Sequence, residues 1–99
     1  MVKHFIIWSF REDLSQEERT EATKKIKTEL EALIDKIDGL TEIKVQTNPL
    51  ASSSGDLMLD STFVSEDALK AYQVNPEHVK AAQFVRSVVG ERKCFDYEV

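Results

Sequence analysis

The sequence VKHFIIWSF at residues 2–10 decides the fold. β-Branched and aromatic side chains dominate this stretch, which favours a β-strand over a helix. Its apolar residues fall on both alternating faces, with Val2, Ile6, Trp8 and Phe10 on one and Phe5 and Ile7 on the other. A strand with two apolar faces is typical of a sheet centre that is covered on both sides. We therefore expect a central strand here, and a cover for each face of its sheet.

A long amphipathic helix is predicted to follow this strand. Ser15 suits the N-cap, and Glu17 and Glu18 favour the first turn. Apolar residues then recur at helical spacing at Ile26, Leu30, Leu33, Ile34 and Ile37. Gly39 is expected to end the helix, whose single apolar stripe should cover one face of the sheet.

Three further strands are indicated by alternation of apolar and polar residues. Residues 41–48 (TEIKVQTN) and 56–63 (DLMLDSTF) flank Pro49 and a serine-rich connector, which predicts a hairpin with a long loop. Residues 92–99 (RKCFDYEV) alternate Phe95, Tyr97 and Val99 with polar side chains and form the predicted last strand.

A broken pair of helices is expected between the hairpin and the last strand. Ser65 can open a short helix, and Asn75 followed by Pro76 looks like a new N-cap and first helical residue. The second helix of the pair is expected to run toward Gly90.

The resulting order, βαββαβ, predicts an α+β fold of the ferredoxin-like kind. Its four-stranded antiparallel sheet should carry both helical segments on one face. We expect the other face to meet the same face of a second protomer, giving a homodimeric α/β barrel. The alternative is a monomer with one face of the sheet exposed to water.

Composition limits the partners of the protein. Residues 1–99 suit one domain, and the net charge of −5 with a pI near 5.0 argues against nucleic acid. The single Cys94 cannot form an intrachain disulfide, and no spacing typical of a metal site is present. Neither a signal peptide nor a membrane span is evident, so we expect a cytoplasmic protein.

Three side chains are candidates for chemistry. His78 is predicted near the N-terminus of a helix, where the dipole favours the neutral imidazole that a general base requires. Tyr72 lies on the preceding short helix, and its hydroxyl could donate to a carbonyl or enolate oxygen. His4 lies on the first strand. The structural alternatives are a His78 bonded to backbone, a Tyr72 packed in the core and a buried, hydrogen-bonded His4.

The residues also resemble a known family. The start VKHFII at 2–7, the pair Thr62-Phe63, the segment AYQVNPEHV at 71–79 and the closing FDY at 95–97 resemble the stress-responsive A/B barrel (Dabb) family. The resemblance spans nearly the whole chain, and its most specific part is the Tyr-x-x-x-Pro-x-His-Val run.

This resemblance implies a dimeric α+β barrel and a pocket at Tyr72 and His78. One plant member is a polyketide cyclase that works without a cofactor. By that resemblance His78 is the base that removes a proton α to a carbonyl, Tyr72 stabilises the oxyanion, and His4 supports them from the strand. The substrate would be a small carbonyl or polyketide-like compound, and the activity that of a cyclase, lyase or isomerase.

Two other functions stay open on the sequence. The first is a stress-related dimer whose pocket binds a small apolar or carbonyl-containing ligand without turnover. The second is an enzyme similar to antibiotic monooxygenases, which share the barrel but lack the Tyr-x-x-x-Pro-x-His-Val run. Fold alone does not separate these functions.

Overall fold

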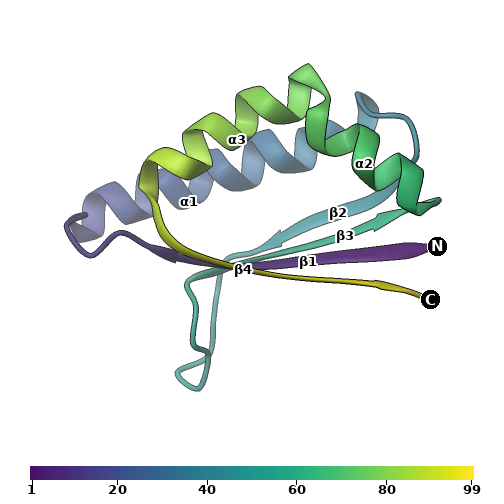
Figure 1. Ribbon diagram of the computed structural model, residues 1–99. Coiled ribbons are helices and arrows are strands. Elements are labelled where there is room, and N and C mark those ends of the chain that lie inside the picture. The colour runs from purple at the N-terminus through teal and green to yellow at the C-terminus, as the bar shows by residue number, and fades with distance from the viewer.

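The first strand lies at the centre of the sheet, as predicted. The computed structural model describes residues 1–99 and forms one four-stranded antiparallel sheet in the order β2-β3-β1-β4, with the helices on one face (Figure 1). The strands are β1 (Val2–Phe10), β2 (Leu40–Gln46), β3 (Leu57–Phe63) and β4 (Val89–Glu98). The helices are α1 (Gln16–Glu31), α2 (Glu66–Val74) and α3 (Pro76–Val88). The ferredoxin-like α+β fold is therefore confirmed.

Helix α1 begins as predicted and ends earlier than predicted. Ser15 accepts a hydrogen bond from the Glu18 backbone, and the Glu18 side chain accepts one from Ser15 N, which forms a capping box. The α-helix gives way after Glu31 to a 3-10 segment, η1 (Ala32–Asp35). Because a 3-10 turn holds fewer residues, Ile34 leaves the buried stripe and is exposed. Gly39, with φ of 85°, serves the turn into β2 instead.

The broken helix pair is present, with the predicted caps. Ser65 accepts from Ala68 N at the start of α2, and Asn75 accepts from Glu77 N at the start of α3. The last strand starts at Val89, earlier than the predicted residue 92. Val89 and its neighbours already pair with the end of β1 across a register shift, so α3 passes directly into β4 without a loop.

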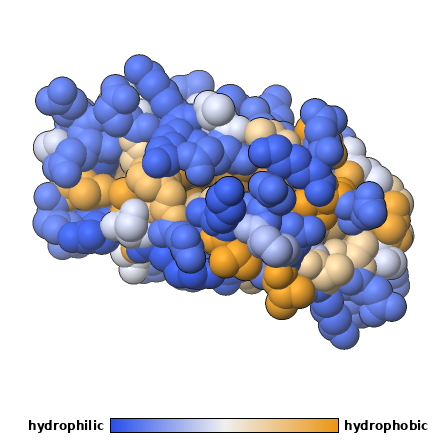
Figure 2. Space-filling view, turned by 90° about the horizontal axis from the view of Figure 1, so that it is seen from above, coloured by the Kyte–Doolittle hydropathy of each residue, from blue (hydrophilic) through white to orange (hydrophobic).

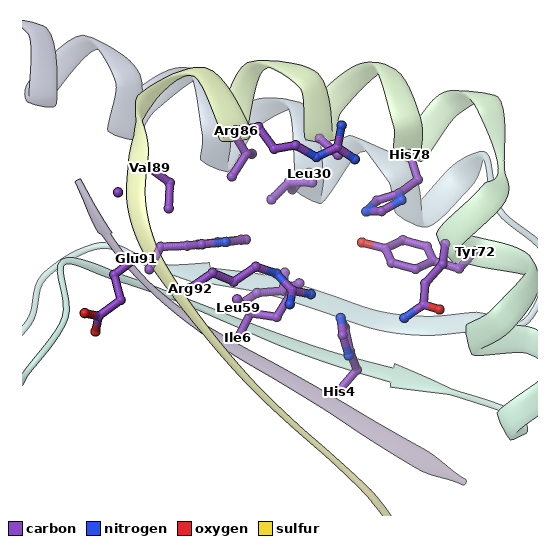
Figure 3. A pocket seen from close by; sticks show the side chains of 15 residues that line it. His4, Ile6, Leu30, Leu59, Tyr72, His78, Arg86, Val89, Glu91 and Arg92 are labelled. Carbon is purple, nitrogen blue, oxygen red and sulfur yellow. The ribbon is translucent and has the colours of Figure 1, made fainter. Parts of the chain in front are cut away.

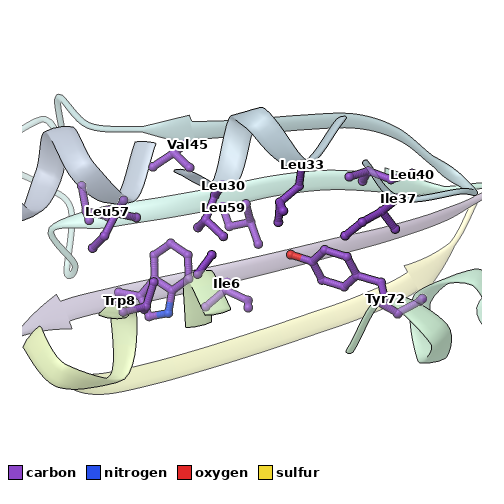
Figure 4. Close-up of a cluster of buried hydrophobic side chains, with 14 of the residues drawn as sticks. Ile6, Trp8, Leu30, Leu33, Ile37, Leu40, Val45, Leu57, Leu59 and Tyr72 are labelled. Carbon is purple, nitrogen blue, oxygen red and sulfur yellow. The ribbon is translucent and has the colours of Figure 1, made fainter. Parts of the chain in front are cut away.

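The core lies between the sheet and the helices. Its buried side chains come from every strand except β4 and from all the helices, and Figure 4 shows part of this cluster, including Ile6, Trp8, Leu30, Leu59 and Tyr72. Seen from above, the molecule presents a largely hydrophilic surface (Figure 2). No helix has the length and apolar character needed to cross a lipid bilayer.

The opposite face of the sheet carries apolar side chains that the chain itself leaves open. Ile7 is 45% exposed, Phe95 69% and Tyr97 42%. The Phe5 and Tyr97 rings stack with their centroids 6.1 Å apart. A face of this kind is typical of a surface that another protein molecule covers.

Candidate functional site

The three predicted residues line one pocket. It has a volume of about 510 Å³ and lies between the sheet and the helices, with His4 on β1, Tyr72 on α2 and His78 on α3 (Figure 3). Trp8 forms part of the wall without filling the space. The fold thus brings together residues that are far apart in the sequence, in a volume that suits a small molecule.

Tyr72 and His78 are adjacent because the helix breaks between them. Asn75 has extended backbone, so α3 leaves α2 in a new direction and places His78 in its first turn. The two rings lie with centroids 4.0 Å apart. Tyr72 Oη and His78 Nδ1 are the buried side-chain polar atoms without a hydrogen-bond partner. Such atoms are rare in folded proteins, and here both belong to the same pocket.

Burial tunes both groups toward their neutral forms. Burial is the largest effect on His78 and lowers its pKa, and the Gln73 backbone opposes this shift. His4, Arg86 and Arg92 each add a smaller lowering effect. Burial also raises the pKa of Tyr72 far above its usual value, which Arg92 only partly offsets. At neutral pH the pocket therefore offers an imidazole that can accept a proton and a phenol that can donate a hydrogen bond.

His4 is held from two sides. It is the cross-strand partner of Asp96 on β4, and its Nδ1 forms a hydrogen bond with the Asp96 carboxylate. The Ser61 hydroxyl donates to the His4 backbone carbonyl at 2.9 Å. With Nδ1 engaged, Nε2 is the nitrogen left for the pocket. The centroid of the His4 ring is 6.3 Å from that of the Tyr72 ring.

The residues that could hold a metal ion are His4, Cys94 and Asp96. Each offers one ligand atom, and these atoms lie within 4.8 Å of one another. Burial and the Asp96 carboxylate raise the pKa of the Cys94 thiol, which donates to Asp96 Oδ1 at 3.4 Å. In this structure the cluster is a hydrogen-bonded support for His4.

Sequence reasoning missed Asp96, Arg86 and Arg92. Arg92 and Asp96 lie on the same polar face of β4. The alternation of polar and apolar residues identified this face but did not show which side of the sheet it would lie on. That face turns toward the helices and the pocket, while Phe95 and Tyr97 point to the open face. One signal in the sequence could have identified Arg92 and Asp96. If the apolar residues of the last strand are assigned to the open face of the sheet, its polar residues must face the pocket.

Comparison with known structures supports the fold over its full length. A dimeric protein of unknown function and ferredoxin-like fold from Bacteroides fragilis is 33% identical, with a TM-score of 0.93 over 99% of this chain and 95% of that one. The hydroxynitrile lyase from Passiflora edulis is 16% identical, with a TM-score of 0.75, 99% of this chain and 92% of that one being covered. A putative antibiotic biosynthesis monooxygenase from Nitrosomonas europaea is 18% identical, with a TM-score of 0.76 over 100% and 98% of the two chains.

The last two similarities show the fold alone. Two further similar structures, 18% and 20% identical, are described as dimeric ferredoxin-like proteins and also show the fold alone. The 33% identical Bacteroides fragilis protein is described as dimeric, which supports a homodimer. No match was found among functionally curated proteins. The sequence model of the stress responsive A/B barrel domain matches residues 2–99. With the Tyr-x-x-x-Pro-x-His-Val run at the pocket and a match of this extent, the chain belongs to the stress responsive A/B barrel (Dabb) family.

Proposed function

We propose that the homodimer is a cofactor-free enzyme of the cyclase or lyase type that acts on a small carbonyl or polyketide-like compound. The observation that carries this proposal is the pairing of Tyr72 Oη with His78 Nδ1 as buried polar atoms without partners in one pocket. A buried polar group without a partner costs stability. A bound substrate that accepts from one group and donates to the other removes that cost.

The reaction begins with proton abstraction. Neutral His78 takes a proton from the carbon α to a carbonyl and becomes an imidazolium. The electron pair of the broken C–H bond moves into the carbonyl to form an enolate, and the Tyr72 hydroxyl donates to its oxygen. The enolate then attacks a second carbonyl of the same molecule, and the new alkoxide receives the proton back from His78. His4, held by Asp96, supports the Tyr72 and His78 pair from β1.

Two relatives support this chemistry by analogy. A protein with the same fold is a hydroxynitrile lyase. Olivetolic acid cyclase, which the sequence resembles at Tyr72 and His78, performs an intramolecular aldol condensation without a cofactor. Both analogies rest on fold and on a short run of residues, so the site itself must carry the proposal.

Deuterium exchange tests the proton abstraction without knowledge of the natural substrate. Methyl hexyl ketone is incubated with the protein in heavy water, and the loss of its α-proton signals is followed by NMR. We expect exchange above the buffer rate. His78→Gln should lower the enzymatic rate by about a hundredfold or more, and Tyr72→Phe by about the same, as for loss of a base or of one oxyanion donor.

Tyr97→Phe is the matched control, because it makes the same chemical change on the open face of the sheet. Its exchange rate should equal that of the wild type. If His78→Gln and Tyr72→Phe exchange as fast as Tyr97→Phe, the assigned roles are wrong. If the wild type does not exceed the buffer rate, the second candidate function, ligand binding without turnover, takes the place of the enzyme.

A further inference from the structure

We propose that the pocket selects an organic anion, with an apolar body and a terminal carboxylate or phosphate held by Arg86 and Arg92. The inference rests on the proposed function in that it concerns the ligand of the same site. It adds a preference for a negative charge on the substrate.

Both arginines reach the pocket from opposite walls. Arg86 lies on α3, and Arg92 lies on β4 as the cross-strand partner of Trp8, whose side chain also lines the pocket. Figure 3 shows the two side chains extending from helix and strand toward the space in front of His78 and Tyr72. They are therefore positioned to contact a ligand that enters from this side.

Neither guanidinium has a carboxylate partner within the protein. Of the four arginines, Arg11 and Arg19 lie within 4.0 Å of the carboxylates of Asp13 and Asp56, whereas Arg86 and Arg92 form no ion pair with a carboxylate. Two unpaired positive charges at one opening attract an anion.

The acidic residue at the pocket does not neutralise them. Glu91 belongs to the lining, but its carboxylate lies 3.9 Å from Lys93 Nζ. In Figure 3 the Glu91 side chain points away from the pocket. The opening therefore stays positive, although the protein as a whole carries a charge of −5.

The two arginines line the same pocket as Tyr72 and His78, so one small ligand can contact all four side chains. Both lower the pKa of His78, and Arg92 also acts on Tyr72. Planar guanidinium groups bind carboxylates and phosphates through paired N–H donors. Apolar walls for the rest of the ligand come from Ile6, Trp8, Leu30, Leu59 and Val85. A keto acid, with its carbonyl at Tyr72 and its acid group at the arginines, fits this layout.

Trp8 provides the readout, because it is the single tryptophan and lines the pocket. Octanoate, octyl phosphate and the neutral octanamide are titrated into the wild-type protein, with Trp8 fluorescence and calorimetry as parallel measurements. We expect at least one anion to bind about tenfold or more tightly than octanamide. Preference between octanoate and octyl phosphate separates a carboxylate site from a phosphate site.

Charge-removing variants assign the effect to residues. Arg86→Gln and Arg92→Gln should each weaken anion binding about tenfold or more and leave octanamide binding unchanged. Lys80→Gln is the control, since it removes the same charge from the exposed side of α3 outside the pocket. Any of three results overturns the inference. The anions and the amide bind with equal affinity, neither anion binds at millimolar concentration, or Lys80→Gln weakens anion binding as much as Arg86→Gln. None of these measurements depends on turnover. The anion preference and the proposed proton transfer can therefore be tested, and can fail, independently of each other.

Discussion

The two faces of the sheet are built from the same strands and meet different partners. On the helix side Phe63 is fully buried by the chain itself, whereas on the other side Phe95 is 69% exposed. Both are aromatic residues on neighbours of β1. The difference teaches that apolar alternation predicts that a face will be covered, but not by which molecule. Substitutions of the same kind on the two faces can separate folding from association.

Phe63→Ala should give the largest effect. Phe63 is fully buried and packs against Tyr72 with ring centroids 4.8 Å apart. Loss of a buried aromatic side chain is expected to lower the free energy of unfolding by about 3–5 kcal/mol. Urea unfolding followed by circular dichroism measures the change. A loss below about 1 kcal/mol would mean that this face is less tightly packed than described.

Phe95→Ala makes the same chemical change on the open face. We expect the folded protomer to persist and the dimer to weaken, because the ring is 69% exposed in the protomer. Removing a large apolar side chain from a buried interface costs about 1.5–3 kcal/mol, or roughly a tenfold to hundredfold rise in Kd. Analytical ultracentrifugation across a concentration series checks this. An unchanged Kd would place the dimer interface elsewhere.

The sequence predicted local features and missed those that depend on strand register. The caps Ser15, Ser65 and Asn75 were predictable because each bonds to backbone within three residues. Tyr72 and His78 were predictable because a helix break brings near neighbours together. Asp96 was not, because its bond to His4 joins residues 92 positions apart through the pairing of β1 with β4.

Asp96→Asn tests that register-dependent contact. Asn keeps the shape and a hydrogen-bond acceptor but loses the negative charge beside His4 Nδ1. Because the Asp96 side chain is 38% exposed, solvent screens the charge, and we expect a loss of only about 1 kcal/mol in the free energy of unfolding. Glu98→Gln, on the same strand, is the control. If the two variants lose the same stability, the contact with His4 is not specific.

His78 should make stability depend on pH. Its pKa is lower in the folded protein than in the unfolded chain, so the unfolded chain binds the proton first as the pH falls. The stability of the wild type should therefore be full above the ordinary histidine pKa of 6.5 and decrease below it. His78→Gln should show a smaller decrease over the same range in urea titrations. An identical pH dependence in the two proteins would show that His78 titrates as in the unfolded chain.

Tyr72→Phe should have the smallest effect on stability, and its sign is informative. The ring stays in the core, while the buried hydroxyl, which has no partner in the protein, is removed. We expect the free energy of unfolding to stay the same or to rise by up to about 1 kcal/mol. Thermal unfolding measures this beside Tyr97→Phe. A variant that folds as well as the wild type but loses deuterium exchange shows that the hydroxyl is retained for the ligand, whereas a clear loss of stability shows that the fold itself uses it.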